Sequence, residues 1–222
     1  MRGRFITFEG GEGTGKSTHA ARLAERLKGF GLGVHLTREP GGSPGAEIIR
    51  YVILSGVAKP LGAEAEAVLF AAARDDHLNT VIRPALERGA WVICDRFSDS
   101  TRIYQGVAGD VDSRSIRALE RIVVGETKPD LTFILDVPVA LGMERAARRR
   151  GASGADRFEG EALAFHEKLR DGFLMLAANE PARCVLIDAT APKDEAAEQI
   201  WKVVSERFDP ATAPPLLEGA AP

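Results

Sequence analysis

The chain has 222 residues, of which 45% are hydrophobic, and this length is enough to bury the core of a single α/β domain. The formal net charge of −3 gives no reason to expect nucleic acid or a membrane surface as the main partner. No run of 18 apolar residues occurs and the first residues show no signal-peptide pattern, so we expect a cytoplasmic protein without membrane contact.

Cys94 and Cys184 lie in short apolar runs that resemble strands. Buried free thiols in a reducing cytosol account for them better than a disulfide or a pair of metal ligands. The histidines lack the spacing of metal ligands, and we interpret them as surface residues or residues behind a site: His19, His35, His77 and His166.

The chain opens with a predicted strand over residues 4–9, which leads into a glycine-rich loop. This loop matches the phosphate-binding pattern G-x-x-x-x-G-K-[ST], and apolar residues at 20, 23, 24 and 27 predict an amphipathic helix after it. Backbone N–H groups at such a helix start attract phosphate, whereas a glycine-rich turn with an incidental lysine would not need the strand and the helix. We expect a nucleoside triphosphate to bind at Gly10, Gly11, Glu12, Gly13, Thr14, Gly15, Lys16, Ser17 and Thr18.

Two side chains of this loop carry chemistry of their own. We expect Lys16 to reach the β- and γ-phosphates and to be catalytic. We expect the hydroxyl of Ser17 to ligate Mg²⁺.

Four more short apolar runs follow at residues 34–37, 91–94, 131–135 and 184–187, with helical patterns between them. Alternating strands and helices predict right-handed crossovers, so we expect an α/β fold of the P-loop NTPase kind, a parallel sheet of five strands covered by helices on both faces. In such sheets ligands bind beyond the carboxyl ends of the strands. The residues just after each strand are therefore the candidates for a site.

The second strand ends in the run T-R-E-P-G-G, which places Arg38 on a loop shaped to approach a ligand. Arg38 and Glu39 forming a solvent-exposed pair is the alternative. In the next helix, Phe70 and Arg74 are four residues apart and share one face. A ring and a guanidinium that project together suit a planar base, although Phe70 as a core residue would show the same pattern.

Asp95 and Arg96 follow the third strand directly. We expect Asp95 to hold Mg²⁺ through a bound water molecule and Arg96 to bind an acceptor phosphate. Both are candidate catalytic residues. A structural Asp–Arg pair is the alternative. Ser100, Thr101, Tyr104 and Gln105 come next, and the last three lie one turn apart in a predicted helix.

Residues 145–158 are expected to form a short mobile lid, because a basic helix end, a glycine-containing break and a further arginine follow one another there. Arginines on a closing lid stabilise the charge of a transferred phosphoryl group, and the closed lid excludes water, so four arginines here are candidate catalytic residues, although not all of them can act on the phosphate. The alternative is a solvated helix terminus. The candidates are Arg148, Arg149, Arg150 and Arg157.

We expect one domain over residues 1–208 and a disordered tail over 209–222, where Pro, Ala and Gly predominate.

These motifs, in this order, resemble those of the thymidylate kinase family over residues 4–208. The resemblance implies transfer of a phosphoryl group from ATP–Mg²⁺ to dTMP, which gives dTDP on the way to dTTP, and it implies a homodimer packed through helices. In the family pattern Phe70 would stack on thymine, Arg74 and Thr101 would bind its edge, and Gln105 would contact the nucleoside. Tyr104 would lie under the deoxyribose, Glu12 would hold the 3′-hydroxyl, and Arg38 and Arg96 would bind the acceptor phosphate; Ser100 belongs to the same segment.

Gly13 stands where one branch of the family has a catalytic arginine, so this chain resembles the branch whose lid supplies that charge. Two alternatives remain at this point. A kinase for another nucleoside monophosphate would differ only in the residues around the base. A nucleotide-dependent switch of the GTPase kind would need a guanine-reading Asn-Lys-x-Asp run, which the sequence lacks.

Overall fold

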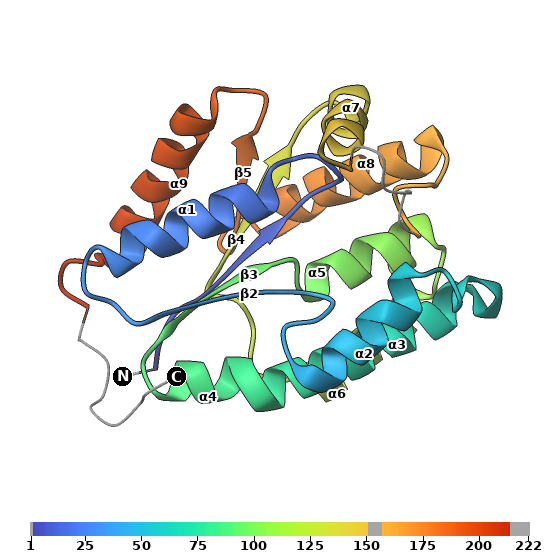
Figure 1. Cartoon of the computed structure of the whole chain (residues 1–222), viewed down its shortest axis with the longest axis horizontal. Helices are drawn as coiled ribbons and strands as arrows, with labels where there is room; N and C mark the ends of the chain where they lie inside the picture. The colour runs from blue at the N-terminus through green and yellow to red at the C-terminus, as the bar shows by residue number, and fades with distance from the viewer. Residues whose placement is uncertain (1, 151–156, 214–222) are drawn as a thin grey trace.

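The computed structural model describes residues 2–150 and 157–213. Five parallel strands form one sheet in the order β2-β3-β1-β4-β5 (Figure 1). They are β1 (Phe5–Glu9), β2 (Val34–Arg38), β3 (Trp91–Asp95), β4 (Leu131–Asp136) and β5 (Cys184–Asp188). Each strand lies within one residue of its predicted range, because each is a β-rich apolar run that ends at a charged residue. The predicted fold class is confirmed.

Helices connect the strands and cover both faces of the sheet (Figure 1). The longer helices are α1 (Lys16–Lys28), α2 (Pro44–Leu54), α3 (Gly62–His77), α6 (Ser113–Val123), α7 (Val139–Arg150), α8 (Leu163–Asn179) and α9 (Lys193–Phe208). Shorter segments are η1 (Lys59–Leu61), η2 (Leu78–Ile82), α4 (Arg83–Glu87), α5 (Ser98–Thr101) and η3 (Arg102–Ala108). Of these, η2 and η3 are π-helical.

Side chains of the central strand β1 alternate between two apolar layers. Ile6 and Phe8 pack with residues of α1 and α9 on one face of the sheet, whereas Phe5 packs with residues of α3, η2 and α4 on the other. On the same side as Phe5, α8 covers Ile134 of β4 and Cys184 of β5. The central strands β1, β3 and β4 are buried on both faces and are apolar almost throughout, as the sequence indicated, whereas the edge strands β2 and β5 are partly exposed.

Three loops that carry predicted site residues meet at one edge of the sheet. The strand register pairs Phe8 of β1 with Asp95 of β3, and Arg38 of β2 with the same Asp95. The carboxyl ends of β2, β3 and β1 therefore lie in a row. The loops that leave them carry Arg38 to Gly42, Arg96 and the phosphate-binding run, so the topology brings these residues to one place.

The start of α2 differs in detail from a simple serine cap. Ser43 precedes Pro44 at the helix start, but its side chain makes no capping bond to its own helix. Instead Ser43 Oγ donates to Asp76 Oδ2 at 2.6 Å, and the same carboxylate oxygen accepts from Ala46 N at 3.1 Å. Asp76 of α3 therefore caps α2 from the neighbouring helix, which ties the two helices together.

The structure also places the cysteines, the histidines and part of the C-terminal segment. Both cysteines are free and buried, as predicted. Three of the histidines are buried, namely His19, His77 and His166. In the predicted tail, residues 209–213 follow α9 and Ala213 packs against the core, while 214–222 lie outside the described residues, as do 151–156 of the predicted lid. Among the described helices, none is long and apolar enough to cross a bilayer.

Candidate active site

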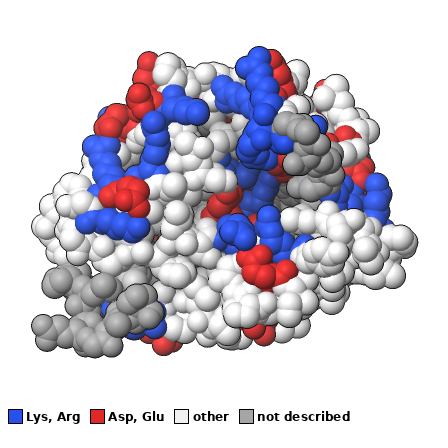
Figure 2. Space-filling view, viewed as in Figure 1, with Lys and Arg blue, Asp and Glu red and all other residues white. Residues whose placement is uncertain are grey.

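A cavity of about 390 Å³ opens at the carboxyl edge of the sheet. Figure 2 shows Lys and Arg side chains gathered around a hollow near the middle of this face of the molecule. Every residue predicted for the acceptor side lines the cavity: Glu12, Arg38, Phe70, Arg74, Arg96, Ser100, Thr101, Tyr104 and Gln105. The predicted phosphate-side residues Gly13, Gly15, Lys16, Ser17 and Thr18 line it as well. The structure therefore joins both predicted sets in one space.

Lys16 lies at the start of α1, at the phosphate end of this cavity. Its Nζ donates to the Gly11 carbonyl oxygen at 2.6 Å and is 3.4 Å from Thr14 Oγ1. Burial, followed by the nearby Arg96 charge, lowers the pKa of Lys16 to about 8. Gly10, Gly11 and Thr14 line a smaller cavity of about 20 Å³ behind the loop.

Gly13 takes a conformation and a position that admit no side chain. Its φ is +67°, and a Cβ atom built on it would lie 1.9 Å from the carbonyl oxygen of Gly142 in α7. An arginine at this position would require the loop or α7 to shift. The close approach of the two backbones is consistent with the expected assignment of catalytic charge to the lid instead of the loop.

Ser17 and Asp95 bring two oxygen groups together beside the phosphate loop. The Ser17 hydroxyl donates a short hydrogen bond to Asp95 Oδ2. Asp95 ends β3, next to the strand that leads into the loop. A hydroxyl and a carboxylate at this point are the ligand types that Mg²⁺ prefers.

Arg96, Glu12 and Tyr104 form a compact charged group on the acceptor side. Arg96 Nη2 lies 2.6 Å from Glu12 Oε1, and the Tyr104 hydroxyl donates to the same oxygen at 2.8 Å. The Arg96 guanidinium also lies over the Tyr104 ring, 4.9 Å from its centroid. Burial alone would raise the pKa of Glu12, but Arg96 and Lys16 outweigh it and lower that pKa to about 2.

The far end of the cavity combines apolar and hydrogen-bonding groups. Phe70 packs against Phe158, with ring centroids 6.0 Å apart, and also lines the cavity, so it is more than a core residue. Arg74 Nη2 donates to Thr101 Oγ1 at 3.0 Å. Gln105 Oε1 is buried and has no hydrogen-bond partner among the residues that the structure describes. This end presents donors from Arg74 and an acceptor from Gln105.

The segment that holds Thr101, Tyr104 and Gln105 is helical, as predicted, but its second part is the π-helix η3. Single π-helical turns are rare in proteins and occur frequently at functional sites. All three side chains are buried and line the cavity.

The expected alternative for Arg38, a pair with Glu39, is wrong. Arg38 Nη2 lies 2.9 Å from Glu47 Oε1 in α2, at an exposed position. Glu39 instead turns inward and binds Arg74, with 2.7 Å between Glu39 Oε2 and Arg74 Nε. Neighbours in the sequence leave a strand end in different directions, so the two charges find different partners.

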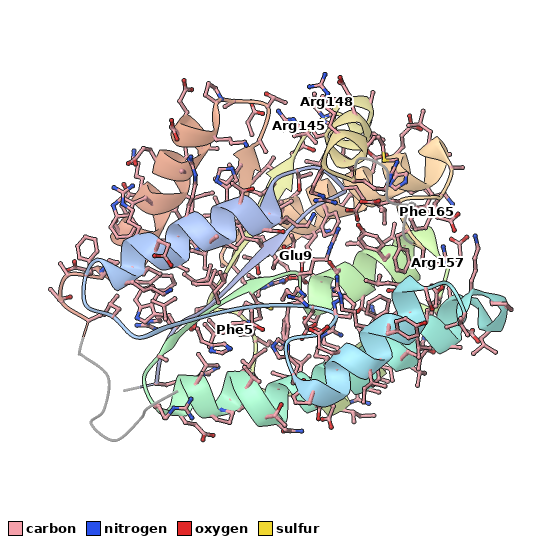
Figure 3. All side chains as sticks on the ribbon, viewed as in Figure 1. Phe5, Glu9, Arg145, Arg148, Arg157 and Phe165 are labelled. Atoms are coloured by element: carbon pink, nitrogen blue, oxygen red, sulfur yellow. The ribbon has the colours of Figure 1, made fainter. Side chains whose placement is uncertain are left out.

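The four candidate lid arginines separate in the structure. Arg149 lines the cavity and pairs with Glu159 at 2.9 Å. Arg148 pairs with Glu144 on the outer side of α7, and Arg150 pairs with Glu159 without lining the cavity. Arg157 pairs with Glu66 of α3 at 2.8 Å, and Figure 3 shows it beside the ends of α2 and α3, far from Arg148.

Glu9, at the end of β1, is a buried carboxylate that sequence analysis did not single out. Its Oε1 accepts from Phe97 N at 2.7 Å and Ser100 N at 3.3 Å, and its Oε2 accepts from Ser100 Oγ at 2.6 Å. Figure 3 shows it near the centre of the molecule. Burial and the charge of Asp99 raise its pKa to about 7. A charged residue inside a buried strand, directly before the phosphate loop, was the available signal.

Comparison with known proteins adds an independent observation. A family model described as thymidylate kinase matches residues 8–200. The chain belongs to the thymidylate kinase family. Thymidylate kinase of Bradyrhizobium diazoefficiens is 59% identical over 212 residues, 96% of this chain and 93% of that protein. That of Nitrobacter winogradskyi is 61% identical over 207 residues, 93% of this chain and 90% of that protein.

A solved thymidylate kinase has the same fold. The crystal structure of the enzyme from Ehrlichia chaffeensis matches with a TM-score of 0.74 and 32% sequence identity, and the match covers 92% of this chain and 100% of that one. The predicted resemblance and the predicted enzyme class, a nucleoside monophosphate kinase, are confirmed.

Proposed function

We infer that this chain is a thymidylate kinase, which transfers the γ-phosphate of ATP to dTMP and yields dTDP and ADP. One observation carries the inference beyond family membership. A single cavity joins a phosphate-binding loop to a second set of basic and aromatic side chains, so two nucleotides can lie end to end in it. Neither a switch nor a simple nucleotide-binding protein needs the second set.

ATP would lie with its phosphates on the loop at the start of α1. There the backbone N–H groups and the positive end of the helix attract the phosphates, and Lys16 neutralises the β- and γ-phosphates. A phosphate acceptor is already a nucleophile at neutral pH, so positioning and charge neutralisation provide most of the catalysis without a strong general base.

Mg²⁺ fits the pair of oxygen groups at Ser17 and Asp95. Their direct hydrogen bond shows that both side chains reach the same point beside the loop. Mg²⁺ in kinase sites is commonly held by one or two protein groups together with water and substrate phosphates. When bound, the ion would offset negative charge on the phosphates.

The base end of the cavity favours a thymine or uracil ring. Arg74 offers only hydrogen-bond donors. Gln105 Oε1 is a buried acceptor without a partner, so it needs a donor from the base. Thymine presents a carbonyl oxygen at C4 and an N–H at N3, which match this pattern. Cytosine presents an amino group and a ring acceptor at the same positions, so it would leave buried groups unpaired.

The remaining acceptor-side residues have positions that suit the sugar and phosphate of dTMP. Glu12 of the phosphate loop and Tyr104 of η3 are hydrogen-bonded to each other and line the cavity, and a deoxyribose would bind beside them. Arg38 and Arg96 line the same cavity and would hold the acceptor phosphate. Among the lid candidates, Arg149 is the one placed to reach the transferred phosphate, because it alone of the four lines the described cavity.

A homodimer is the assembly that the surface supports. Four large apolar side chains on neighbouring helices are more than half exposed, namely Ile48 and Tyr51 of α2, Val68 of α3 and Ile122 of α6. Since α3 packs against both α2 and α6, these helices form one continuous side of the molecule. Large apolar side chains exposed on neighbouring helices favour a protein interface on this side.

A coupled assay of ADP release tests the proposed reaction. We expect turnover with ATP and dTMP, weaker turnover with dUMP, and little with UMP, CMP or AMP. A preference for AMP or CMP would contradict the base-side roles of Phe70, Arg74 and Thr101. Equal ATP hydrolysis with and without dTMP would contradict a kinase. The cytoplasmic location and the absence of a nucleic-acid partner stay predictions.

A further inference from the structure

A line of buried hydrogen bonds runs from Arg74 away from the cavity. Arg74 Nε donates to Glu39 Oε2 at 2.7 Å, and the second carboxylate oxygen, Glu39 Oε1, is 3.1 Å from His77 Nδ1. His77 Nε2 is in turn 2.8 Å from Thr37 Oγ1. Arg74, Glu39 and His77 are 4%, 6% and 0% exposed, so water competes little for these bonds.

The chemistry of the carboxylate gives its bond to His77 a direction. A carboxylate only accepts, so His77 Nδ1 carries a proton and donates to Glu39. The other ring nitrogen, Nε2, forms a hydrogen bond with the Thr37 hydroxyl. Thr37 therefore orients His77, and His77 orients Glu39.

Gly42 closes this arrangement from the outside. Its φ is +86°, and a Cβ atom at this position would lie 2.5 Å from both His77 Nε2 and Thr37 Oγ1. Three residues of the T-R-E-P-G-G run, Thr37, Glu39 and Gly42, thus surround His77. The run therefore has two roles: it forms a loop that approaches a ligand, and three of its six residues hold His77 in place behind the site.

The hydrogen bonds of Arg74 leave one of its nitrogens available. Nε is held by Glu39, and Nη2 is held by the Phe97 carbonyl oxygen at 3.2 Å and by Thr101 Oγ1 at 3.0 Å. Nη1 makes no hydrogen bond with any part of the chain that the structure describes. A guanidinium is planar, so fixing Nε and Nη2 also fixes the direction of the two Nη1 donors.

We propose that Glu39, held by His77 and Thr37, is a positioning residue that sets the direction of the Arg74 donors and thereby selects a pyrimidine with a carbonyl instead of an amino group at C4. The inference rests on the proposed placement of the base against Arg74. Glu39 borders the cavity, but both of its oxygens are occupied, so it acts through Arg74.

The first test compares dTMP with 5-methyl-dCMP, two acceptors that differ only at positions 3 and 4 of the ring. In Glu39→Gln one amide oxygen replaces two carboxylate oxygens, and the amide NH₂ cannot accept from His77. We expect the KM for dTMP to rise about tenfold, with a smaller change in kcat, and the preference for dTMP over 5-methyl-dCMP to fall by a similar factor. The KM for ATP should stay within about twofold of the original value.

Asp76→Asn is the matched control. Asp76 adjoins His77 and binds the start of α2, but it does not contact Arg74. We expect this variant to melt at a lower temperature and to keep the preference for dTMP. If Asp76→Asn lost the preference as fully as Glu39→Gln, general loosening of α3 would explain both, and the proposal would be wrong.

Two substitutions of His77 separate orientation from packing. An asparagine amide can place its nitrogen near the position of Nδ1, whereas a glutamine amide places it near Nε2. We expect His77→Asn to keep the preference within about threefold and His77→Gln to lose most of it. Equal preferences in the two variants, or the reverse order, would overturn the proposal, and this pair decides the matter if Glu39→Gln does not fold.

Arg74→Lys distinguishes failure of this proposal from failure of the proposed base site. We expect Arg74→Lys to lose the preference, because an ammonium lacks the planar pair of donors. If Arg74→Lys kept it, the placement of the base against Arg74 would be wrong. If Arg74→Lys lost it while Glu39→Gln and His77→Gln kept it, only the role of Glu39 would be wrong.

Discussion

The side chain of Lys16 is a buried titratable amine. The residue is 7% exposed, and burial and Arg96 together lower its pKa to about 8. Near pH 8, about half of the molecules without ATP therefore carry a neutral Lys16. The phosphates of ATP favour the charged form, because opposite charges stabilise each other.

ATP binding should accordingly take up protons at about pH 8, by up to about half a proton per site. Calorimetry in two buffers of different ionisation enthalpy measures this number directly. The uptake should shrink as the pH falls towards about 6, where Lys16 is already protonated before ATP arrives.

Lys16→Ala serves as the control, since it has no group to titrate at this position. It should show no such uptake, and its kcat should fall by at least about 10²-fold while its far-ultraviolet circular dichroism stays unchanged. Normal turnover in this variant would mean that Lys16 does not neutralise the transferred phosphate.

At the scale of elements, the end of α7 shows that helix geometry sorts residues that the sequence places side by side. Successive residues of a helix point about 100° apart, so Arg148 and Arg149 cannot face the same space. Arg149 faces the cavity, whereas Arg148 is 78% exposed and pairs with Glu144 one turn earlier.

We predict that Arg149→Ala lowers kcat by at least about 10²-fold, because an arginine at the transferred phosphate stabilises spread negative charge. Arg148→Ala removes the same kind of side chain from the same turn. Its kcat should stay within about threefold of the original value, because the ion pair that it breaks is exposed. Steady-state kinetics with saturating ATP and dTMP measure both values. A larger loss in Arg148→Ala would reverse the assignment.

The junction between β1 and α5 depends on Glu9, which binds the backbone N–H groups of Phe97 and Ser100. Burial and Asp99 raise its pKa from 4.5 to about 7, so the folded chain holds a proton that the unfolded chain has lost at intermediate pH. The contribution of Glu9 to the free energy of unfolding is therefore fully present below pH 4.5 and is lost as the pH rises to about 7. A shift of this size corresponds to about 3 kcal/mol.

We predict that the free energy of unfolding falls between about pH 5 and pH 8 more steeply in the original chain than in Glu9→Gln. Urea titrations at several pH values give the free energy of unfolding of both proteins as a function of pH. The difference between the two proteins removes the contribution of all other titrating groups. Glu25→Gln, at an exposed position paired with Lys28, controls for the loss of one carboxylate. Parallel curves for the original chain and Glu9→Gln would contradict the raised pKa.

At the scale of the whole molecule, the side formed by α2, α3 and α6 exposes several large apolar side chains. Tyr51 is 75% exposed and Ile122 is 76% exposed, on helices that flank α3. Covering both in a symmetric interface would remove this surface from water.

We predict that the double variant Tyr51→Glu, Ile122→Glu sediments as a monomer, because charges in an apolar interface cannot keep their water. Met175→Glu, an equally drastic change at an exposed position of α8, should leave the assembly unchanged. Analytical ultracentrifugation distinguishes the masses. A dimer that survives the double variant would place the interface elsewhere.

The sequence alone determined the five strands, their parallel arrangement and the phosphate loop, because these depend on local patterns. A buried strand needs a short apolar run, and a phosphate loop needs glycines and a lysine at fixed spacing. The acceptor-side residues Phe70, Arg74, Thr101 and Gln105 were also predictable, since spacing along helices indicates a shared face.

Only the tertiary structure decided which charges meet. It paired Glu39 with Arg74 instead of its neighbour Arg38, turned Arg149 and not Arg148 towards the cavity, and brought Gly142 so near to Gly13 that no side chain fits. The physical reason is that such contacts depend on directions set by distant elements packing together. A sequence pattern records the period of an element, whereas the partner of a buried charge depends on how several elements are placed in space.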